Sequence, residues 1–372
     1  MIKRTVVHLA LLVSSNSVFA QTQPSYAEQI DALFSDISDN IPGCTVGAIK
    51  QGELIHQAGY GSANLELNVP LDGNHIHRIA SVSKQFTAMA VLLLADEGKI
   101  KLEDDIREHL PELRDYKNKV TINSMLGHFS GMGDYDFVDD LTDEKAMDLR
   151  SSAGGPFRLG NQDYLSIKEF YDYVKTVPLR RAPDQQWEYS NYAYFLLSML
   201  VEKVSGESLR TYSDKRIFKP LGMKHTFFSD DSTEIVANRA SGYSKNKSGE
   251  YFTNMTNLFW VGDGGLHTNI EDMLLWDHYF YSPTLGKQPH ALLKHFNTPN
   301  SQHLTRGSLY ANGQGVEEKD DGKVFSHGGG WLGVATHYQR IPDKQLSAIV
   351  FCNDDTLNPT EYSKKIIEII SN

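Results

Sequence analysis

The chain has 372 residues, of which 40% are hydrophobic and 22% are charged, a composition typical of a folded globular protein. Its formal net charge of −11 argues against a basic surface that would bind nucleic acid or an anionic membrane. The two cysteines, Cys44 and Cys352, are too few for a small disulfide scaffold. The length allows one large domain of two lobes, or two domains.

Residues 1–20 have the pattern of a secretion signal. A basic start is followed by an apolar run from Val6 to Val13, and residues 18–20 place small side chains where signal peptidase cuts. Polar residues 14–17 interrupt the run well short of a membrane-spanning length. We therefore expect cleavage after Ala20, no stable membrane anchor, and a periplasmic or secreted mature chain of residues 21–372.

The first elements of the mature chain are a helix and a hairpin. Apolar residues at helical spacing predict an amphipathic helix from Tyr26 to Ile41. The segments Cys44–Lys50 and Leu54–Tyr60 indicate two strands joined by a short turn. A second, strongly apolar helix follows Ser81 and ends near Gly98.

The middle of the chain shows helical patterns separated by polar loops. Thr121 and Ser166 are suited to cap two short helices, the second running from Ile167 to Val174. A long apolar helix is predicted from Tyr192 to Val204. The stretch from Asp134 to Asp163 is rich in Asp, Ser and Gly, which indicates a surface loop near a functional site.

The C-terminal part returns to strands. Gly-rich and Pro-Asp turns separate three strand patterns and predict an antiparallel meander of Val324–Ser326, Val334–Arg340 and Leu346–Cys352. Asn358 followed by Pro359 predicts the start of a last helix.

Strands at both chain ends with helices between them predict an α/β (α+β) fold. A single antiparallel sheet would be built from both termini and flanked by helices, with an all-helical lobe inserted. The α/β lobe would comprise approximately residues 25–80 and 255–372, and the helical lobe approximately residues 81–254.

The motif Ser81-Val82-Ser83-Lys84 places a serine three residues before a lysine at the start of an apolar helix. Residues three apart on a helix share a face, so the Lys84 amine can reach and activate the Ser81 hydroxyl as a nucleophile. A helix N-cap is the alternative interpretation of Ser81. The same spacing at Ser244 and Lys247 falls in a polar turn and does not indicate a site.

A serine nucleophile needs a base, and Lys or Tyr can serve only as the neutral amine or the phenolate. Three Tyr-x-Asn triplets begin at Tyr116, Tyr189 and Tyr310. We favour Tyr189-Ser190-Asn191, because it lies in a loop that leads directly into an apolar helix. The first triplet lies in a charged run and the third beside a Gly-rich strand. A tyrosine anchored in the core is the alternative interpretation of Tyr189.

The segment from Ser326 to Trp331 contains His327 followed by Gly328, Gly329 and Gly330. Consecutive glycines let a substrate approach the backbone closely and leave amides free to donate hydrogen bonds. The alternative is a hairpin turn without a functional role.

These motifs together resemble the serine β-lactamase and penicillin-binding protein superfamily, in particular its branch of class C β-lactamases, D-amino-acid peptidases and related esterases. The resemblance rests on Ser81-x-x-Lys84, Tyr189-Ser190-Asn191 and His327-Gly328-Gly329 in the expected order, with support from Leu126–Gly131 and Asp263–Thr268. It covers the chain from about Ile30 to the C-terminus.

The resemblance implies that Ser81 attacks a carbonyl to form an acyl-enzyme, with Lys84 and Tyr189 sharing the proton transfers. The backbone amides of Ser81 and Gly330 would form the oxyanion hole. Substrate contacts are implied for Asn191, His327, Gly328 and Gly329. The resemblance implies no metal and no cofactor.

The resemblance also implies that the first and last strands pair antiparallel. Cys44 and Cys352 would then lie opposite each other, and we expect a disulfide between them.

His327 departs from the family pattern, since the β-lactamases usually carry lysine there. A neutral imidazole would hold a substrate carboxylate less firmly. We therefore expect an exported monomeric serine hydrolase acting on D-amino-acid peptides, small amides or esters, rather than an efficient β-lactamase. A class C-type β-lactamase, a slowly acylating penicillin-binding sensor and a structural protein with an inactive site are the alternatives. The expected partner is a small-molecule or short-peptide substrate, with no nucleic acid.

Overall fold

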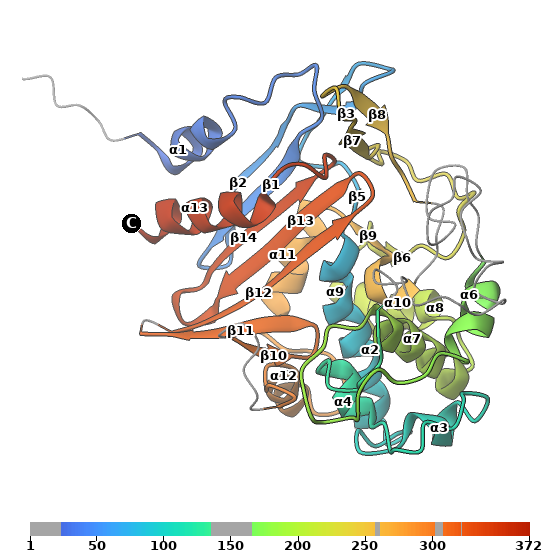
Figure 1. Ribbon diagram of the computed structural model, residues 1–372. Helices are drawn as coiled ribbons and strands as arrows, with labels where there is room; N and C mark the ends of the chain where they lie inside the picture. The colour runs from blue at the N-terminus through green and yellow to red at the C-terminus, as the bar shows by residue number, and fades with distance from the viewer. Residues whose placement is uncertain (1–23, 135–165, 257–260, 302–307, 321) are drawn as a thin grey trace, which may run out of the picture.

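The structure is a computed structural model that describes residues 24–134, 166–256, 261–301, 308–320 and 322–372 (Figure 1). The expected secretion signal, and all but the first residue of the expected loop from Asp134 to Asp163, lie outside these residues. Within the described ranges, no helix combines the length and apolar character needed to span a membrane.

A seven-stranded antiparallel sheet forms the centre of the fold. In spatial order its strands are β10 (Leu309–Ala311), β11 (Gln314–Lys319), β12 (Gly322–Trp331), β13 (Val334–Ile341), β14 (Leu346–Cys352), β1 (Cys44–Lys50) and β2 (Glu53–Tyr60). The first and last strands of the sequence are therefore neighbours, which confirms the sheet built from both chain ends.

The pairing of β1 with β14 places Cys44 directly opposite Cys352, and the two residues are joined by a disulfide. The bond links positions 308 residues apart. A native disulfide of this kind typically stabilises a fold by about 2–4 kcal/mol.

One face of the sheet is covered by α1 (Tyr26–Leu33) and α13 (Pro359–Ser371), which lie side by side in Figure 1. Their apolar residues pack on alternate side chains of β1 and β14, including Val46 and Val350. The helix α1 ends at Leu33, eight residues before the predicted end. The following Ser, Asp and Asn side chains compete with helical hydrogen bonds, although Ile37 still packs on the same core.

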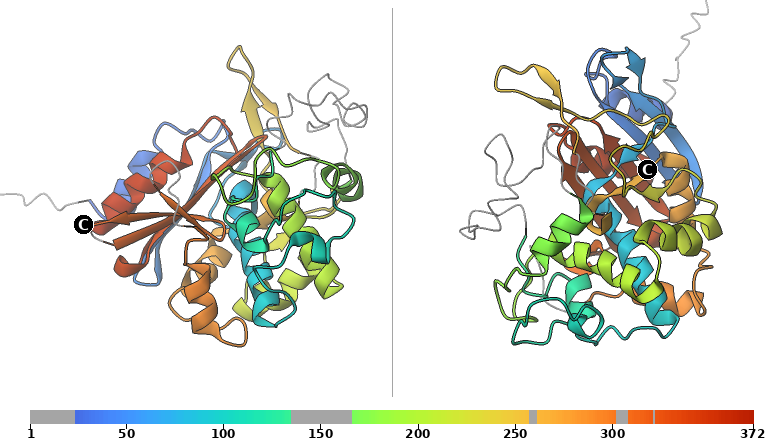
Figure 2. Two further views of the ribbon diagram at one scale, coloured as in Figure 1. Left: turned by 60° about the horizontal axis from the view of Figure 1, so that its bottom comes forward. Right: turned by 90° about the vertical axis from the view of Figure 1, so that its right-hand side faces the viewer.

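The other face of the sheet packs on α11 (Ile270–Tyr279) and on the helical region, which Figure 2 shows beside the sheet. The helices of that region are α2 (Lys84–Asp96), α3 (Ile106–His109), α4 (Ile122–Leu126), α6 (Ile167–Val174), α7 (Asn191–Ser205), α8 (Leu209–Ser213), α9 (Lys219–Leu221), α10 (Val261–Gly264) and α12 (Pro289–Phe296). The predicted N-caps Thr121 and Ser166 are confirmed, since each side chain accepts a backbone N–H of its helix.

The structure also contains short strands that the sequence patterns did not indicate. Three of them lie in the segment predicted to be all-helical, and all pair outside the large sheet. They are β3 (Ser62–Asn64), β4 (Val69–Pro70), β5 (His77–Arg78), β6 (Phe227–Phe228), β7 (Tyr243–Lys245), β8 (Tyr251–Thr253) and β9 (Leu266–Thr268).

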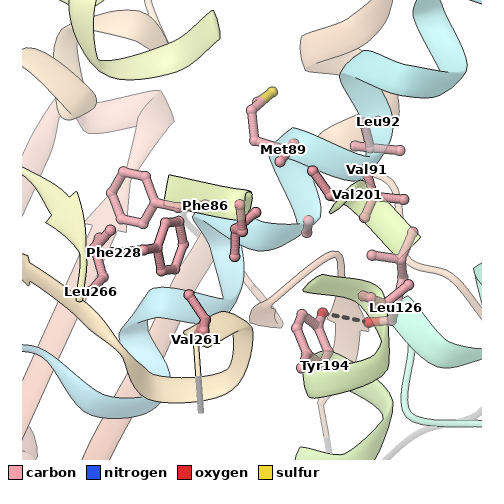
Figure 3. Packing of buried hydrophobic residues seen from close by; sticks show 14 of the residues in the cluster. Phe86, Met89, Val91, Leu92, Leu126, Tyr194, Val201, Phe228, Val261 and Leu266 are labelled. Atoms are coloured by element: carbon pink, nitrogen blue, oxygen red, sulfur yellow. Dashed lines mark hydrogen bonds between the residues drawn. The ribbon is translucent and has the colours of Figure 1, made fainter. Parts of the chain in front are cut away.

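Helix α2 is the central element of the larger hydrophobic core. Its first eleven residues are buried, so it is covered on nearly every side. Figure 3 shows Phe86 beside Phe228 and Leu266, and the Tyr194 hydroxyl donating to the Leu126 carbonyl at the neighbouring helix contact. This packing fixes the helix that follows Ser81.

Candidate active site

Ser81 lies in a 3₁₀ turn, Ala80–Ser83, that leads into α2, so the helix begins at Lys84 rather than at the serine. The turn is held from two sides. The Ile79 carbonyl accepts from Thr336 Oγ1 of β13 at 2.8 Å, and the Ile79 amide donates to the Leu266 carbonyl of β9 at 3.0 Å. Ala80 has a φ of +45°, a left-handed conformation that is uncommon outside glycine. The surrounding contacts hold this strained backbone directly before Ser81.

Lys84 is fully buried, and its Nζ reaches three oxygen atoms of the described residues. These are Ser81 Oγ at 3.2 Å, Asn191 Oδ1 at 2.6 Å and the Asp263 carbonyl at 2.7 Å. The carbonyl oxygens of Asn191 and Asp263 can only accept, so they fix two N–H bonds of Lys84. The third substituent of the nitrogen, a proton or a lone pair, is then directed at the Ser81 hydroxyl.

Tyr189 hydrogen-bonds to Ser81, and its ring centre lies 4.8 Å from Lys84 Nζ. Burial raises the pKa of Tyr189 well above its usual value. The carboxyl groups of Asp134 and Asp263 act in the same direction, and the bond to Ser81 acts in the opposite one. The raised pKa favours the protonated phenol at Tyr189.

Asn191 is occupied at both ends of its carboxamide. Oδ1 accepts from Lys84, and Nδ2 donates to the two carboxylate oxygens of Asp134 at 2.9 and 3.1 Å. Asp134 and Asn191 are both buried. The side chain expected to orient a substrate amide therefore holds Lys84 in place and links it to a buried carboxylate.

The glycine segment is part of a strand and not a hairpin turn. The partner strand β11 pairs with Gly322–Ser326 of β12, whereas His327–Trp331 extend beyond it and pair with β13 on their other side. The extended part contacts the Ser81 turn. A Cβ at Gly329 would lie 2.3 Å from Thr336 Oγ1 and 2.5 Å from the Ile79 carbonyl, so this approach requires glycine. Gly330 and Ser81 line one small cavity, as an oxyanion hole requires.

His327 makes two hydrogen bonds that define its tautomer. Nδ1 lies 2.6 Å from the Gly328 carbonyl, which only accepts, so Nδ1 carries the proton. Nε2 lies 3.0 Å from the Tyr310 hydroxyl and accepts from it. Burial, together with the nearby Lys84, lowers the pKa of His327 to about 3. The imidazole is neutral, and both of its nitrogens are used within the protein.

Tyr310 is a site residue that the sequence patterns do not favour. Its hydroxyl meets His327, while Tyr116, the first candidate, is buried in the core of the helical region. The turn between β10 and β11 brings Tyr310 to the site, and only a correct sheet register could have shown this. Ser244 bonds to Asp355 and Asn254 in a surface hairpin, away from the site.

His128 is a second residue that the motifs did not single out, although it lies within the Leu126–Gly131 stretch. It is fully buried, its Nδ1 accepts from the Ser190 amide at 3.1 Å, and its ring centre is 4.3 Å from that of Tyr189. Burial lowers the pKa of His128 well below its usual value. His128 thus supports the Tyr189 loop as a neutral aromatic surface.

No group of three or more His, Cys, Asp or Glu residues in the described ranges is placed to hold a metal ion. The buried His77 hydrogen-bonds to the Thr45 hydroxyl.

Comparison with known proteins gives a consistent result. The family model described as Beta-lactamase matches residues 30–368. Protein flp of Staphylococcus aureus (strain N315) is 26% identical over 92% of this chain and 65% of its own length, and the D-aminopeptidase of Gluconobacter oxydans (strain 621H) is 24% identical over 88% and 59%. The crystal structure of a penicillin-binding protein from Bacillus halodurans superposes with a TM-score of 0.75, at 23% identity over 92% of this chain and 99% of that one. The chain thus spans about two thirds or less of the length of these two curated relatives.

Proposed function

Because the chain belongs to the beta-lactamase family, we propose that it is a serine hydrolase that forms an acyl-enzyme on Ser81. The observation that carries the proposal is the contact of Ser81 Oγ with Lys84 Nζ at 3.2 Å and with the Tyr189 phenol. Both contacts lie beside the open edge of β12. A serine with an adjacent base and nearby free amides is equipped for acyl transfer.

The proposed reaction starts with Lys84 as the neutral amine. Its lone pair takes the Ser81 proton while Oγ attacks the substrate carbonyl. The amides of Ser81 and Gly330 stabilise the charge on the carbonyl oxygen. Tyr189, a neutral phenol, donates its proton to the leaving group. The Lys84 ammonium then returns a proton to the Tyr189 oxygen. Water then attacks the acyl-enzyme by the reverse sequence of proton transfers.

The proposal gives Asn191 and His327 roles that differ from the substrate contacts implied by the family resemblance. Asn191 and Asp134 position Lys84, because the carboxamide of Asn191 is used at both ends. His327 and Tyr310 form one wall beside Tyr189, whose ring centre is 6.2 Å from that of His327. The site lies between the sheet lobe of residues 25–80 and 255–372 and the lobe of residues 81–254.

The substrates we propose are D-amino-acid peptides, small amides or esters. One of the relatives that match this chain is named D-aminopeptidase. In addition, the neutral His327 is hydrogen-bonded at both ring nitrogens and offers no fixed cation for the carboxylate of a β-lactam. These observations support the proposal of a peptidase or esterase over that of a class C-type β-lactamase. The leader pattern of residues 1–20 supports export to the periplasm or medium.

The test is incubation of the purified protein and its Ser81→Ala variant with a penicillin, a nitrophenyl ester and a D-alanyl dipeptide. Intact mass reports the acyl adduct, and product formation reports turnover. We expect an adduct and turnover that both vanish in Ser81→Ala. An adduct that persists without turnover would identify a slowly acylating sensor. Turnover that survives the substitution would refute the proposal.

A further inference from the structure

A second cavity, of about 190 Å³, lies beside the proposed site. The same three segments of the chain line it and the small cavity at Ser81, namely residues 77–81, 263–267 and 330–334. Arg78 lines both cavities, which are therefore neighbours, and its Nε donates to the Gly264 carbonyl at 2.9 Å. Arg239, from the loop before β7, brings a second guanidinium to the larger cavity.

Arg239 is half-buried, and no Asp or Glu of the described residues lies within ion-pair distance of it. The acidic side chains nearby are already used, because Asp230 and Glu234 bind Arg210 at 3.0 and 2.6 Å. Burial lowers the pKa of Arg239 from its ordinary value, and the charge of Glu234 acts in the opposite direction but is outweighed. A partly desolvated cation that no described carboxylate contacts within ion-pair distance favours an anionic ligand.

The rest of the lining adds little opposing charge. His77 and His267 are buried and neutral, and burial lowers the pKa of each to about 3. Arg78 and Arg239 both lower the pKa of His267 further, so both guanidiniums act on this one imidazole. Asp231 also lines the cavity, but it is exposed and its Oδ1 accepts from the Thr233 amide and hydroxyl.

The proposed proton transfers imply that the cavity lies on the acyl side of the nucleophile. The leaving group must depart toward its proton donor, Tyr189, which lies beside His327 at the start of the open edge of β12. The acyl part of a substrate laid along that edge then points the other way, past Gly330 and Trp331. Leu332, the next residue, lines the cavity.

We propose that the cavity binds a carboxylate carried by the acyl part of the substrate, through the guanidiniums of Arg78 and Arg239. The inference rests on the proposed function and narrows its substrate class. Preferred substrates are monoesters or monoamides of short dicarboxylic acids, including acyl groups from acidic D-amino acids. The planar guanidinium of arginine can donate two parallel hydrogen bonds to a carboxylate, and such charge-assisted hydrogen bonds are stronger than those between neutral groups.

The test compares two esters that differ only at the far end of the acyl group. These are 4-nitrophenyl hemiglutarate, with a terminal carboxylate, and 4-nitrophenyl glutaramate, with a neutral carboxamide of the same size. After subtraction of uncatalysed hydrolysis, we expect kcat/KM to favour the hemiglutarate by about 10-fold or more, as one charge-assisted contact allows. The preference should shrink with added salt, since part of it is screened.

The Arg239→Gln variant should lower kcat/KM for the hemiglutarate at least about 5-fold more than for the glutaramate. The Arg239→Lys variant keeps the positive charge but lacks the planar guanidinium. Its ratio of kcat/KM for the two esters should lie between those of Arg239→Gln and wild type. The matched control is Lys247→Gln, which removes the same charge from the exposed turn between β7 and β8 and should leave the ratio at the wild-type value.

The outcomes separate this inference from the proposed function. Equal kcat/KM for the two esters in the wild-type protein, with Ser81-dependent hydrolysis of both, would overturn the carboxylate site and leave the hydrolase intact. An equal effect of Arg239→Gln and Lys247→Gln on the ratio would overturn it as well. Loss of Ser81 dependence for both esters would refute the proposed function itself.

Discussion

At the residue scale, the proposed mechanism rests on the proton state of Tyr189. Burial, together with the carboxyl groups of Asp134 and Asp263, raises the pKa of Tyr189, which favours the protonated phenol. A protonated phenol can donate a proton but cannot act as the initial base. In the proposed mechanism the initial base is therefore Lys84, whose Nζ lies 3.2 Å from Ser81 Oγ.

Tyr189→Phe tests this division of labour. The substitution keeps the ring, which packs on His128, and deletes the hydroxyl that bonds Ser81. We expect ester hydrolysis to slow by roughly 10²–10⁴, as for loss of a general acid, with little change in the urea midpoint. Acylation at near wild-type speed would show that Tyr189 is only a core residue. Lys84→Ala should be at least as damaging, because it removes the base.

His327→Lys tests the departure from the family pattern. A lysine at this position would place an ammonium near the Tyr310 hydroxyl and the open edge of β12. We expect the variant to keep its acyl-enzyme and to react faster with carboxylate-bearing β-lactams relative to neutral nitrophenyl esters. The ratio of the two acylation rates is the measurement. A ratio equal to that of wild type would show that position 327 does not contact the carboxylate.

At the element scale, helix starts and strand alternation were accessible from the sequence, and long-range register was not. Thr121 and Ser166 cap helices as predicted, because capping depends on residues three positions apart. The sequence does not indicate Tyr310, because its place beside His327 depends on how β10, β11 and β12 pair. The burial that raises the pKa of Tyr189 likewise comes from segments far away in the sequence.

The open end of β12 is the element on which the site depends most. A Cβ at Gly329 would clash with Thr336 Oγ1 and the Ile79 carbonyl, which together hold the Ser81 turn. Gly329→Ala should therefore move β12 away from Ser81 and lower kcat/KM about 100-fold or more, with a loss of about 1–3 kcal/mol of stability. Gly315→Ala on β11 is the matched control, since its Cβ would meet only the Ser326 carbonyl at 3.4 Å. Equal effects of the two substitutions on activity would contradict this account.

At the scale of the whole molecule, folding removes several histidines from water. Burial lowers the pKa to about 3 for His77, His267 and His327, to about 4 for His337, and well below the ordinary value for His128. The sequence shows the residues but not their burial. Their neutrality couples the stability of the fold to pH.

This coupling predicts destabilisation in mild acid. In the unfolded chain these histidines take up protons near pH 6.5, whereas in the folded protein they stay neutral down to about pH 3–4. The unfolded state therefore binds more protons in this window, and the free energy of unfolding falls as the pH drops from about 7 toward 4. Each histidine that titrates fully contributes a slope of about 1.4 kcal/mol per pH unit. Urea unfolding at pH 7.5, 6.5 and 5.5, at constant ionic strength, measures the slope.

The variant His337→Gln isolates one of these groups outside the active site. His337 is buried and its Nδ1 lies 2.6 Å from Ser363 Oγ, a contact that a glutamine amide can replace. In this variant, the free energy of unfolding should depend less steeply on pH between 7.5 and 5.5. Its slope should decrease by up to about 1.4 kcal/mol per pH unit, because one proton fewer is taken up on unfolding. His290→Gln, at an exposed position, should leave the slope unchanged. Equal stability of the wild-type protein at pH 7.5 and 5.5 would show that the buried histidines do not control its response to acid.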